Sequence, residues 1–162
     1  MCIRKWGVLL LLLILSGCAD AGALSPEPAA EDALSVSALF QAENGEALQD
    51  GAAQFSAGDS GGVHPLDSSG IVSVSGLPRS GELLLTLFDR RQEVRGTMTL
   101  SFTQGAVIDA MTGEDGVGHV TVRDDTREVG LLFRLTEDGA LQCTLWLART
   151  VPSGPDLPRK GV

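Results

Sequence analysis

The chain of 162 residues has no tyrosine, only three cysteines and only two histidines. Two of the cysteines, Cys2 and Cys18, lie close to the N-terminus, and Cys143 stands alone more than a hundred residues later. A disulfide within the folded part is therefore not expected. A domain of this length can bury enough apolar surface to fold without one.

Basic residues are also scarce. Twelve Lys and Arg stand against 21 Asp and Glu, which gives a net charge of −9. If an N-terminal leader containing Arg4 and Lys5 is removed, the net charge falls to −11. Phosphate groups attract positive proteins, so nucleic acid is excluded as a partner and contact with anionic lipid headgroups is disfavoured. The acidity instead favours solubility.

Catalytic motifs are missing as well. The sequence contains no Gly-x-Ser-x-Gly elbow, no Ser-x-x-Lys motif and no phosphate-binding loop. His64 and His119 each lack a second histidine nearby that would suggest a zinc site. Cys143 alternates with Leu141 and Leu145, which is typical of a small buried hydrophobic residue and not of a nucleophile. We therefore expect neither an enzyme nor a cofactor.

One acidic segment leaves an alternative open. Asp109, Glu114 and Asp115 lie close together with glycines between them, and their oxygens could bind calcium. Their spacing does not fit an EF-hand, so a plain acidic turn is the favoured interpretation. A second charged segment, 123–127, is predicted to be the tip of a hairpin.

The N-terminus has the layout of a secretory signal. Arg4 and Lys5 precede an apolar run from Trp6 to Leu15, and small residues follow it. As a helix this run is about 15 Å long. That length is too short to cross a bilayer core of about 30 Å.

The four residues Leu15-Ser16-Gly17-Cys18 resemble the lipobox of bacterial lipoproteins at every position. The resemblance implies that residues 1–17 are a signal peptide and that Cys18 becomes the lipidated N-terminus, with palmitate-type acyl chains. The protein would then be held on the extracytoplasmic side of a membrane in the bacterial cell envelope, since two acyl chains anchor a soluble domain stably. The alternative is an ordinary cleaved signal peptide with a chance cysteine.

Composition divides the rest of the chain. Residues 18–33 contain Pro26 and Pro28 and no apolar periodicity, which predicts a disordered tether that spans about 45 Å when extended. Residues 149–162 contain three prolines and are predicted to be a disordered tail. One domain, residues 34–148, lies between them.

This domain reads as β-strands, because apolar residues alternate with polar ones between turn residues. The pattern predicts an all-β fold, a single antiparallel β-sandwich of about eight strands. Gly58–Gly62 is predicted to be a flexible loop. The expected strands cover residues 34–40, 53–55, 72–74, 83–87, 98–102, 120–122, 129–135 and 141–147.

Gly70–Pro78, an alternating strand that ends in Gly-Leu-Pro, resembles the hairpin of prealbumin-like β-sandwich modules, which include carboxypeptidase regulatory-like and collagen-adhesin B-type domains. The resemblance covers roughly residues 34–102. It implies a turn at Arg79–Gly81 and a returning strand from Leu83, and it says little about function. The lysine–asparagine crosslink of adhesin-type domains is excluded, because Lys160 is the only lysine after the leader.

Trp146 is the one candidate binding residue. It is predicted to lie on the strand face opposite Cys143, together with Gln142 and Thr144. An exposed tryptophan there would suit an envelope protein or a glycan. The alternative is a core tryptophan covered by a loop or by the tail.

The sequence as a whole predicts a membrane-anchored, non-catalytic lipoprotein with a binding or structural domain. The alternatives are a subunit of an envelope complex, or a calcium-dependent or enzymatic module that uses residues 109–115.

Overall fold

The computed structural model describes residues 33–58 and 60–150, and these residues form ten β-strands and no helix. The predicted all-β class is confirmed. The strands are β1 (Leu34–Ala42), β2 (Ala52–Ala57), β3 (Ser60–Pro65), β4 (Ile71–Leu77), β5 (Gly81–Phe88), β6 (Val94–Gln104), β7 (Asp109–Thr112), β8 (Gly118–Val122), β9 (Thr126–Leu135) and β10 (Leu141–Thr150).

The predicted count of eight strands is too low by two, since β3 and β7 were not expected. β3 includes part of the predicted loop Gly58–Gly62. A Cβ on Gly61 would lie 2.6 Å from the Phe55 carbonyl oxygen, so glycine permits the close approach of β2 and does not mark a flexible loop. β7 has only four residues, which is too short for alternation to be recognised.

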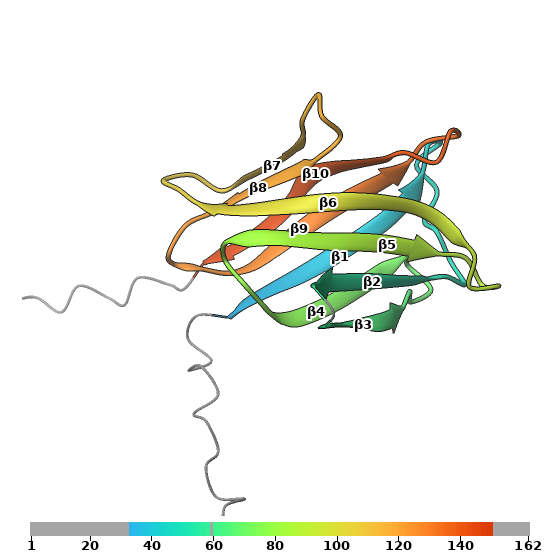
Figure 1. The fold of residues 1–162 in the computed structure, drawn as a ribbon, viewed down its shortest axis with the longest axis horizontal. Coiled ribbons are helices and arrows are strands. Elements are labelled where there is room, and N and C mark those ends of the chain that lie inside the picture. The colour runs from blue at the N-terminus through green and yellow to red at the C-terminus, as the bar shows by residue number, and fades with distance from the viewer. Residues whose placement is uncertain (1–32, 59, 151–162) are drawn as a thin grey trace, which may run out of the picture. The chain divides into compact units, whose positions relative to one another are not determined.

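All ten strands belong to one sheet, in the order β3-β2-β5-β6-β8-β7-β10-β9-β1-β4. The sheet is mixed, because β1 pairs with β9 and β6 with β8 in parallel, so the expectation of a purely antiparallel arrangement is wrong. The sheet curves strongly, and its edge strands β3 and β4 approach each other without sharing a ladder (Figure 1). Its narrowest join is between β7 and β10, where the pairing consists of Thr144 with Met111.

The Gly-Leu-Pro segment agrees with the expectation in its local geometry but not in its pairing. Gly76 has φ +79, a left-handed conformation that favours glycine, and Leu77 is buried. However, β4 pairs with β1 and β5 pairs with β2 and β6. The segment between them is therefore a crossover between distant parts of the sheet and not a hairpin turn.

The core consists of the inward-facing residues of the strands, as the alternation predicts. Phe40 on β1 stacks on Phe133 on β9, with ring centroids 5.1 Å apart. The largest fully buried side chains are Phe40, Phe102, Phe133, Leu34, Leu83, Leu85, Leu87, Leu100, Leu131, Val36, Val120 and Val122. Each contributes about 1.5–3 kcal/mol by leaving water.

Five turns share one geometry, in which the first residue donates to the carbonyl of the fifth and the fourth donates to the carbonyl of the first. The fourth residue has a positive φ in each. This is the geometry of a three-residue loop in which a type I turn is followed by a left-handed residue that forms a β-bulge. The fourth residues are Gly45, Gly70, Gln92, Gly116 and Gly139.

Both ends of the sheet-forming segment lie on the same side of the sheet. Ser35, near the start of β1, and Arg149, near the end of β10, are both aligned with Glu128 on β9. We call this the chain-end side. The first strand starts at Leu34, where the predicted domain begins, and the last strand ends at Thr150, two residues beyond the predicted boundary.

Candidate functional site

The three acids of the calcium alternative do not converge. Asp109 is an exposed residue at the start of β7, whereas Glu114 and Asp115 lie in the turn between β7 and β8. Asp109 precedes this turn by four residues, about 13 Å along an extended strand. Calcium ligands lie about 2.3–2.6 Å from the ion, so the three carboxylates are too widely spread for one site. Among residues 33–58 and 60–150, no group of three or more His, Cys, Asp or Glu side chains is placed to hold a metal ion.

Asp115 has a structural partner within its turn. Its Oδ1 accepts a hydrogen bond from the backbone N–H of Val117 at 3.0 Å and lies 3.6 Å from Nε2 of His119. The Val117 bond and the nearby imidazole lower the pKa of the Asp115 carboxyl. This carboxylate thus supports the turn, as the favoured interpretation of the sequence predicts.

The two histidines lie apart. His64 is half-buried on β3, opposite Ala53, and His119 lies on β8, opposite Met111 and Ser101. Strands β2, β5 and β6 separate β3 from β8 in the sheet.

Cys143 is buried on the inner face of β10, and only 1% of the residue is exposed, as predicted. Burial raises the pKa of its thiol to about 12, so the thiolate is scarce at neutral pH. Its backbone N–H donates to Oγ1 of Thr112 on β7 at 2.6 Å. These surroundings fit a packing role and not a nucleophile.

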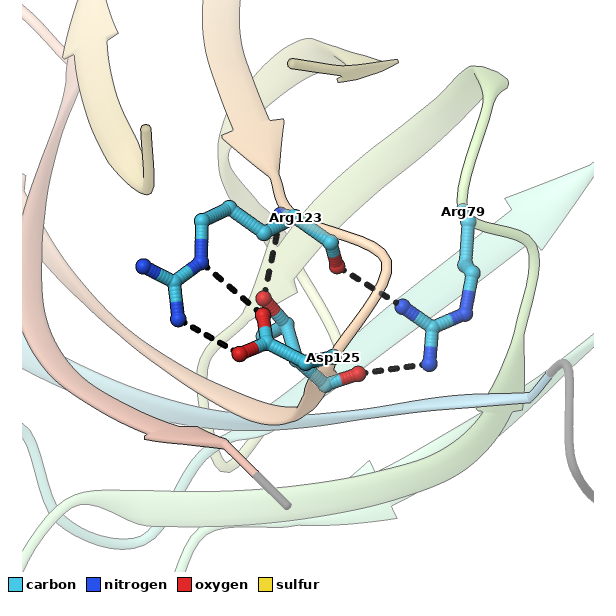
Figure 2. Close-up of polar contacts among 4 residues, drawn as sticks. Arg79, Arg123 and Asp125 are labelled. Atoms are coloured by element: carbon cyan, nitrogen blue, oxygen red, sulfur yellow. Dashed lines mark hydrogen bonds and ion pairs between the residues drawn. The ribbon is translucent and has the colours of Figure 1, made fainter. Parts of the chain in front are cut away.

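No pattern in the sequence predicts a buried arginine at the Gly-Leu-Pro crossover. Arg79 is only 7% exposed, and its guanidinium donates to the carbonyl oxygens of Arg123 at 3.2 Å and Thr126 at 2.5 Å (Figure 2). It therefore joins the β4–β5 crossover to the segment between β8 and β9.

The segment whose carbonyl groups accept the hydrogen bonds of Arg79 is itself stabilised by an ion pair. The Arg123 guanidinium donates to both carboxylate oxygens of Asp125, at 2.9 and 2.5 Å, and this pairing lowers the pKa of the carboxyl (Figure 2). The segment is not the predicted hairpin tip, because β8 and β9 do not pair with each other. It is a second crossover, and the ion pair between Arg123 and Asp125 stabilises its turn.

Trp146 is exposed by 47% and shares the outer face of β10 with Gln142 and Thr144, as predicted. The register of β10 against β9 shifts between Leu145 and Leu147, which makes Trp146 the extra residue of a β-bulge. Gly130 on β9 lies beneath it, since a Cβ there would be 3.2 Å from Cε3 of the indole.

Strand β7 adds an exposed residue to this face. Met111, which is 57% exposed, pairs with Thr144. Asp109 lies two residues before Met111, just as Trp146 lies two residues after Thr144, and the two strands are antiparallel. The pairing between these strands is Thr144 with Met111, and it does not extend to Trp146 and Asp109. We call Trp146, Thr144 and Met111, which are exposed on the same face, the Trp146 patch.

Cys18, the predicted signal peptide, the tether and the end of the tail from residue 151 lie outside the described residues. Within the part of the chain that the structure describes, no helix is long and apolar enough to cross a membrane. No family model matches the chain, and a comparison with curated proteins finds no match.

Proposed function

We propose that this protein is a lipid-anchored lipoprotein of the bacterial cell envelope, whose β-domain binds or supports a partner without catalysis. The observation that carries the proposal is the match of Leu15-Ser16-Gly17-Cys18 to a lipobox after a short apolar run. The start of the sheet at Leu34 supports it, since fifteen residues separate Cys18 from the folded domain.

The arrangement of the sheet suits a tethered domain. The tether enters on the chain-end side, which leaves the opposite side and the outer face of the sheet available to a partner. The outer face carries the Trp146 patch, whose aromatic and Met side chains are of the kinds enriched at protein interfaces. This patch favours an envelope protein as the partner, so the protein would be a subunit of an envelope complex.

We also propose that the fold is related to prealbumin-like sandwiches, with Gly70–Pro78 as the shared element. The left-handed Gly76 and the buried Leu77 support this relationship. The mixed sheet, and the fact that β4 and β5 do not pair with each other, are differences that any relationship must accommodate.

Replacing the lipidated residue tests the anchor. In a bacterial host fed labelled palmitate, Cys18→Ala should abolish incorporation of label and move the protein out of the membrane fraction. Cys143→Ala is the matched control and should keep both label and membrane partitioning. Normal cleavage and membrane partitioning of the Cys18→Ala chain would overturn the anchor.

Recovery of a partner tests the binding role. Trp146→Ala should reduce recovery of an envelope protein from detergent-solubilised membranes, whereas Leu84→Ala, an equally exposed apolar residue on β5, should not. Equal recovery with both variants would remove the Trp146 patch from the proposal.

A further inference from the structure

The sulfur atoms of the described residues belong to Met98, Met111 and Cys143, and their surroundings differ sharply. Met111 is 57% exposed, whereas Met98 is only 3% exposed. Cys143 is buried as well, and burial raises the pKa of its thiol to about 12, which keeps the reactive thiolate scarce. An oxidant dissolved in water therefore reaches the sulfur of Met111 far more readily than the other two.

The position of Met111 is fixed by its strand. It pairs with His119 on β8 on one side and with Thr144 on β10 on the other, because β7 lies between these strands (Figure 1). Ala110, the preceding residue, is buried, so Met111 lies on the outer face of the sheet. The backbone of Met111 is thus held in the ladder while its thioether is open to water. An oxygen atom added to this sulfur would be hydrated.

Met98 has the opposite environment on the inner face of β6. A Cβ on Gly118 would lie 2.9 Å from Sδ of Met98, which shows how closely the sulfur is packed. A sulfoxide there would place a polar oxygen in an apolar core, at a cost in free energy. Met98 should therefore react only in chains that have unfolded, and it provides an internal comparison for Met111.

Oxidation of Met111 would change the Trp146 patch. The patch contains two large exposed apolar side chains, Met111 and Trp146. Conversion of a thioether to a sulfoxide replaces a flexible apolar group with a polar hydrogen-bond acceptor. The oxidised patch would keep Trp146 as its one large apolar side chain, and a partner that buries both groups would bind it less tightly.

We propose that Met111 is a site of oxidation by hydroperoxides and that its oxidation state controls binding at the Trp146 patch. The sulfur lone pair attacks the terminal peroxide oxygen, an S–O bond forms and the O–O bond breaks. The proton of that oxygen passes to the leaving oxygen, which departs as water or an alcohol. The sulfur loses two electrons, and two thiols of a reductant return them, with formation of a disulfide and water. The control of binding rests on the proposed function, whereas the oxidation does not.

Peptide mapping tests the site of oxidation. The full chain is treated with dilute hydrogen peroxide for increasing times and is then cleaved before aspartate residues. Asp109 lies between the two methionines, so peptides 89–108 and 109–114 carry Met98 and Met111 separately. In the folded chain Met111 should oxidise at least about tenfold faster than Met98, and in urea the two rates should agree within about twofold. Equal rates in the folded chain would overturn the proposal.

Thermal unfolding tests whether the oxidised chain keeps its fold. Because the sulfur of Met111 is exposed, its oxidation should shift the melting temperature by less than about 2 °C. A larger decrease would show that the oxygen disturbs the pairing of β7, and Met111 would then be a site of damage and not a control of the surface.

Recovery of the envelope protein from detergent-solubilised membranes tests the control of binding. Peroxide treatment of this chain, followed by removal of the peroxide, should reduce recovery several-fold. Met111→Leu has an apolar side chain without sulfur and should keep its recovery after the same treatment. Met111→Gln is polar and of similar length, and should lose recovery without any peroxide.

The variants separate failure of this inference from failure of the proposed function. An equal loss of recovery in peroxide-treated Met111→Leu would place the effect at another group and overturn control by Met111. If Trp146→Ala leaves recovery unchanged, the patch is not the binding site, and its control by Met111 fails with it. Peptide mapping would still decide whether Met111 is the oxidised residue, because that measurement needs no partner.

Discussion

The ten-stranded sheet divides into two regions that are held together by different means. Strands β10, β9, β1 and β4 form a four-strand region, and β3, β2, β5, β6, β8 and β7 form a six-strand region. Within each region, neighbouring strands pair over four or more residues, whereas Thr144 and Met111 are the pair between β10 and β7. Cohesion between the regions therefore depends on side chains and not on the backbone ladder.

Two polar ties link these regions, and they differ in strength. On the chain-end side, the guanidinium of Arg79 donates to the carbonyl oxygen of Arg123, just after β8, and to that of Thr126, the first residue of β9. Near the join, the hydroxyl of Thr112 accepts from the N–H of Cys143. Hydrogen bonds to a charged group are worth about 1.5–3 kcal/mol and neutral ones about 0.5–1.5 kcal/mol. The hydrogen bonds of Arg79 should therefore contribute more to stability than the bond between Thr112 and Cys143.

Removal of the charged tie should have the largest effect. Arg79→Ala leaves the carbonyls of Arg123 and Thr126 without this partner in a buried place, and should lower the free energy of unfolding by about 3 kcal/mol. Urea unfolding followed by circular dichroism measures the change. Arg91→Ala, at an exposed position in the turn between β5 and β6, is the matched control and should stay within about 0.5 kcal/mol. A loss as small as that of the control would mean that the crossover does not need Arg79.

Removal of the neutral tie should cost less. Thr112→Val keeps the shape of the side chain but leaves the N–H of Cys143 without its acceptor, so unfolding should become easier by about 1–2 kcal/mol. Thr97→Val, an exposed position on β6, provides the control in the same urea experiment. If Thr112→Val proved more damaging than Arg79→Ala, the order of the two ties would be reversed.

The sequence predicts the inner faces of both regions well and their connection poorly. Alternation identified Leu34, Phe133 and Cys143 as inward-facing, because period two depends only on the strand itself. The strand order cannot be predicted in this way, because the parallel pairing of β1 with β9 joins residues more than ninety positions apart in the sequence. Local patterns carry no information about such pairing.

The candidate site shows the same limit. The outward direction of Trp146 follows from alternation along β10, but its support by Gly130 depends on a bulge against β9. The burial of Arg79 depends on carbonyls 44 and 47 residues later in the chain. A basic residue after Gly-Leu-Pro is, by sequence alone, an ordinary turn residue.

The smallest predicted effect concerns a turn of the six-strand region. Four of the five turns of shared geometry have glycine at the left-handed position, whereas the turn between β5 and β6 has Gln92, with φ +64. A residue with a side chain pays a steric cost there, although glycine also loses more backbone freedom on folding. We expect the first effect to exceed the second, so Gln92→Gly should raise the free energy of unfolding by about 0.5 kcal/mol. The reverse change, Gly116→Ala, meets no atom within 4 Å and tests conformation alone; it should lower stability by about 1 kcal/mol. Thermal unfolding of both variants measures the pair. A destabilised Gln92→Gly variant would show that the side chain of Gln92 makes a compensating contact in its turn.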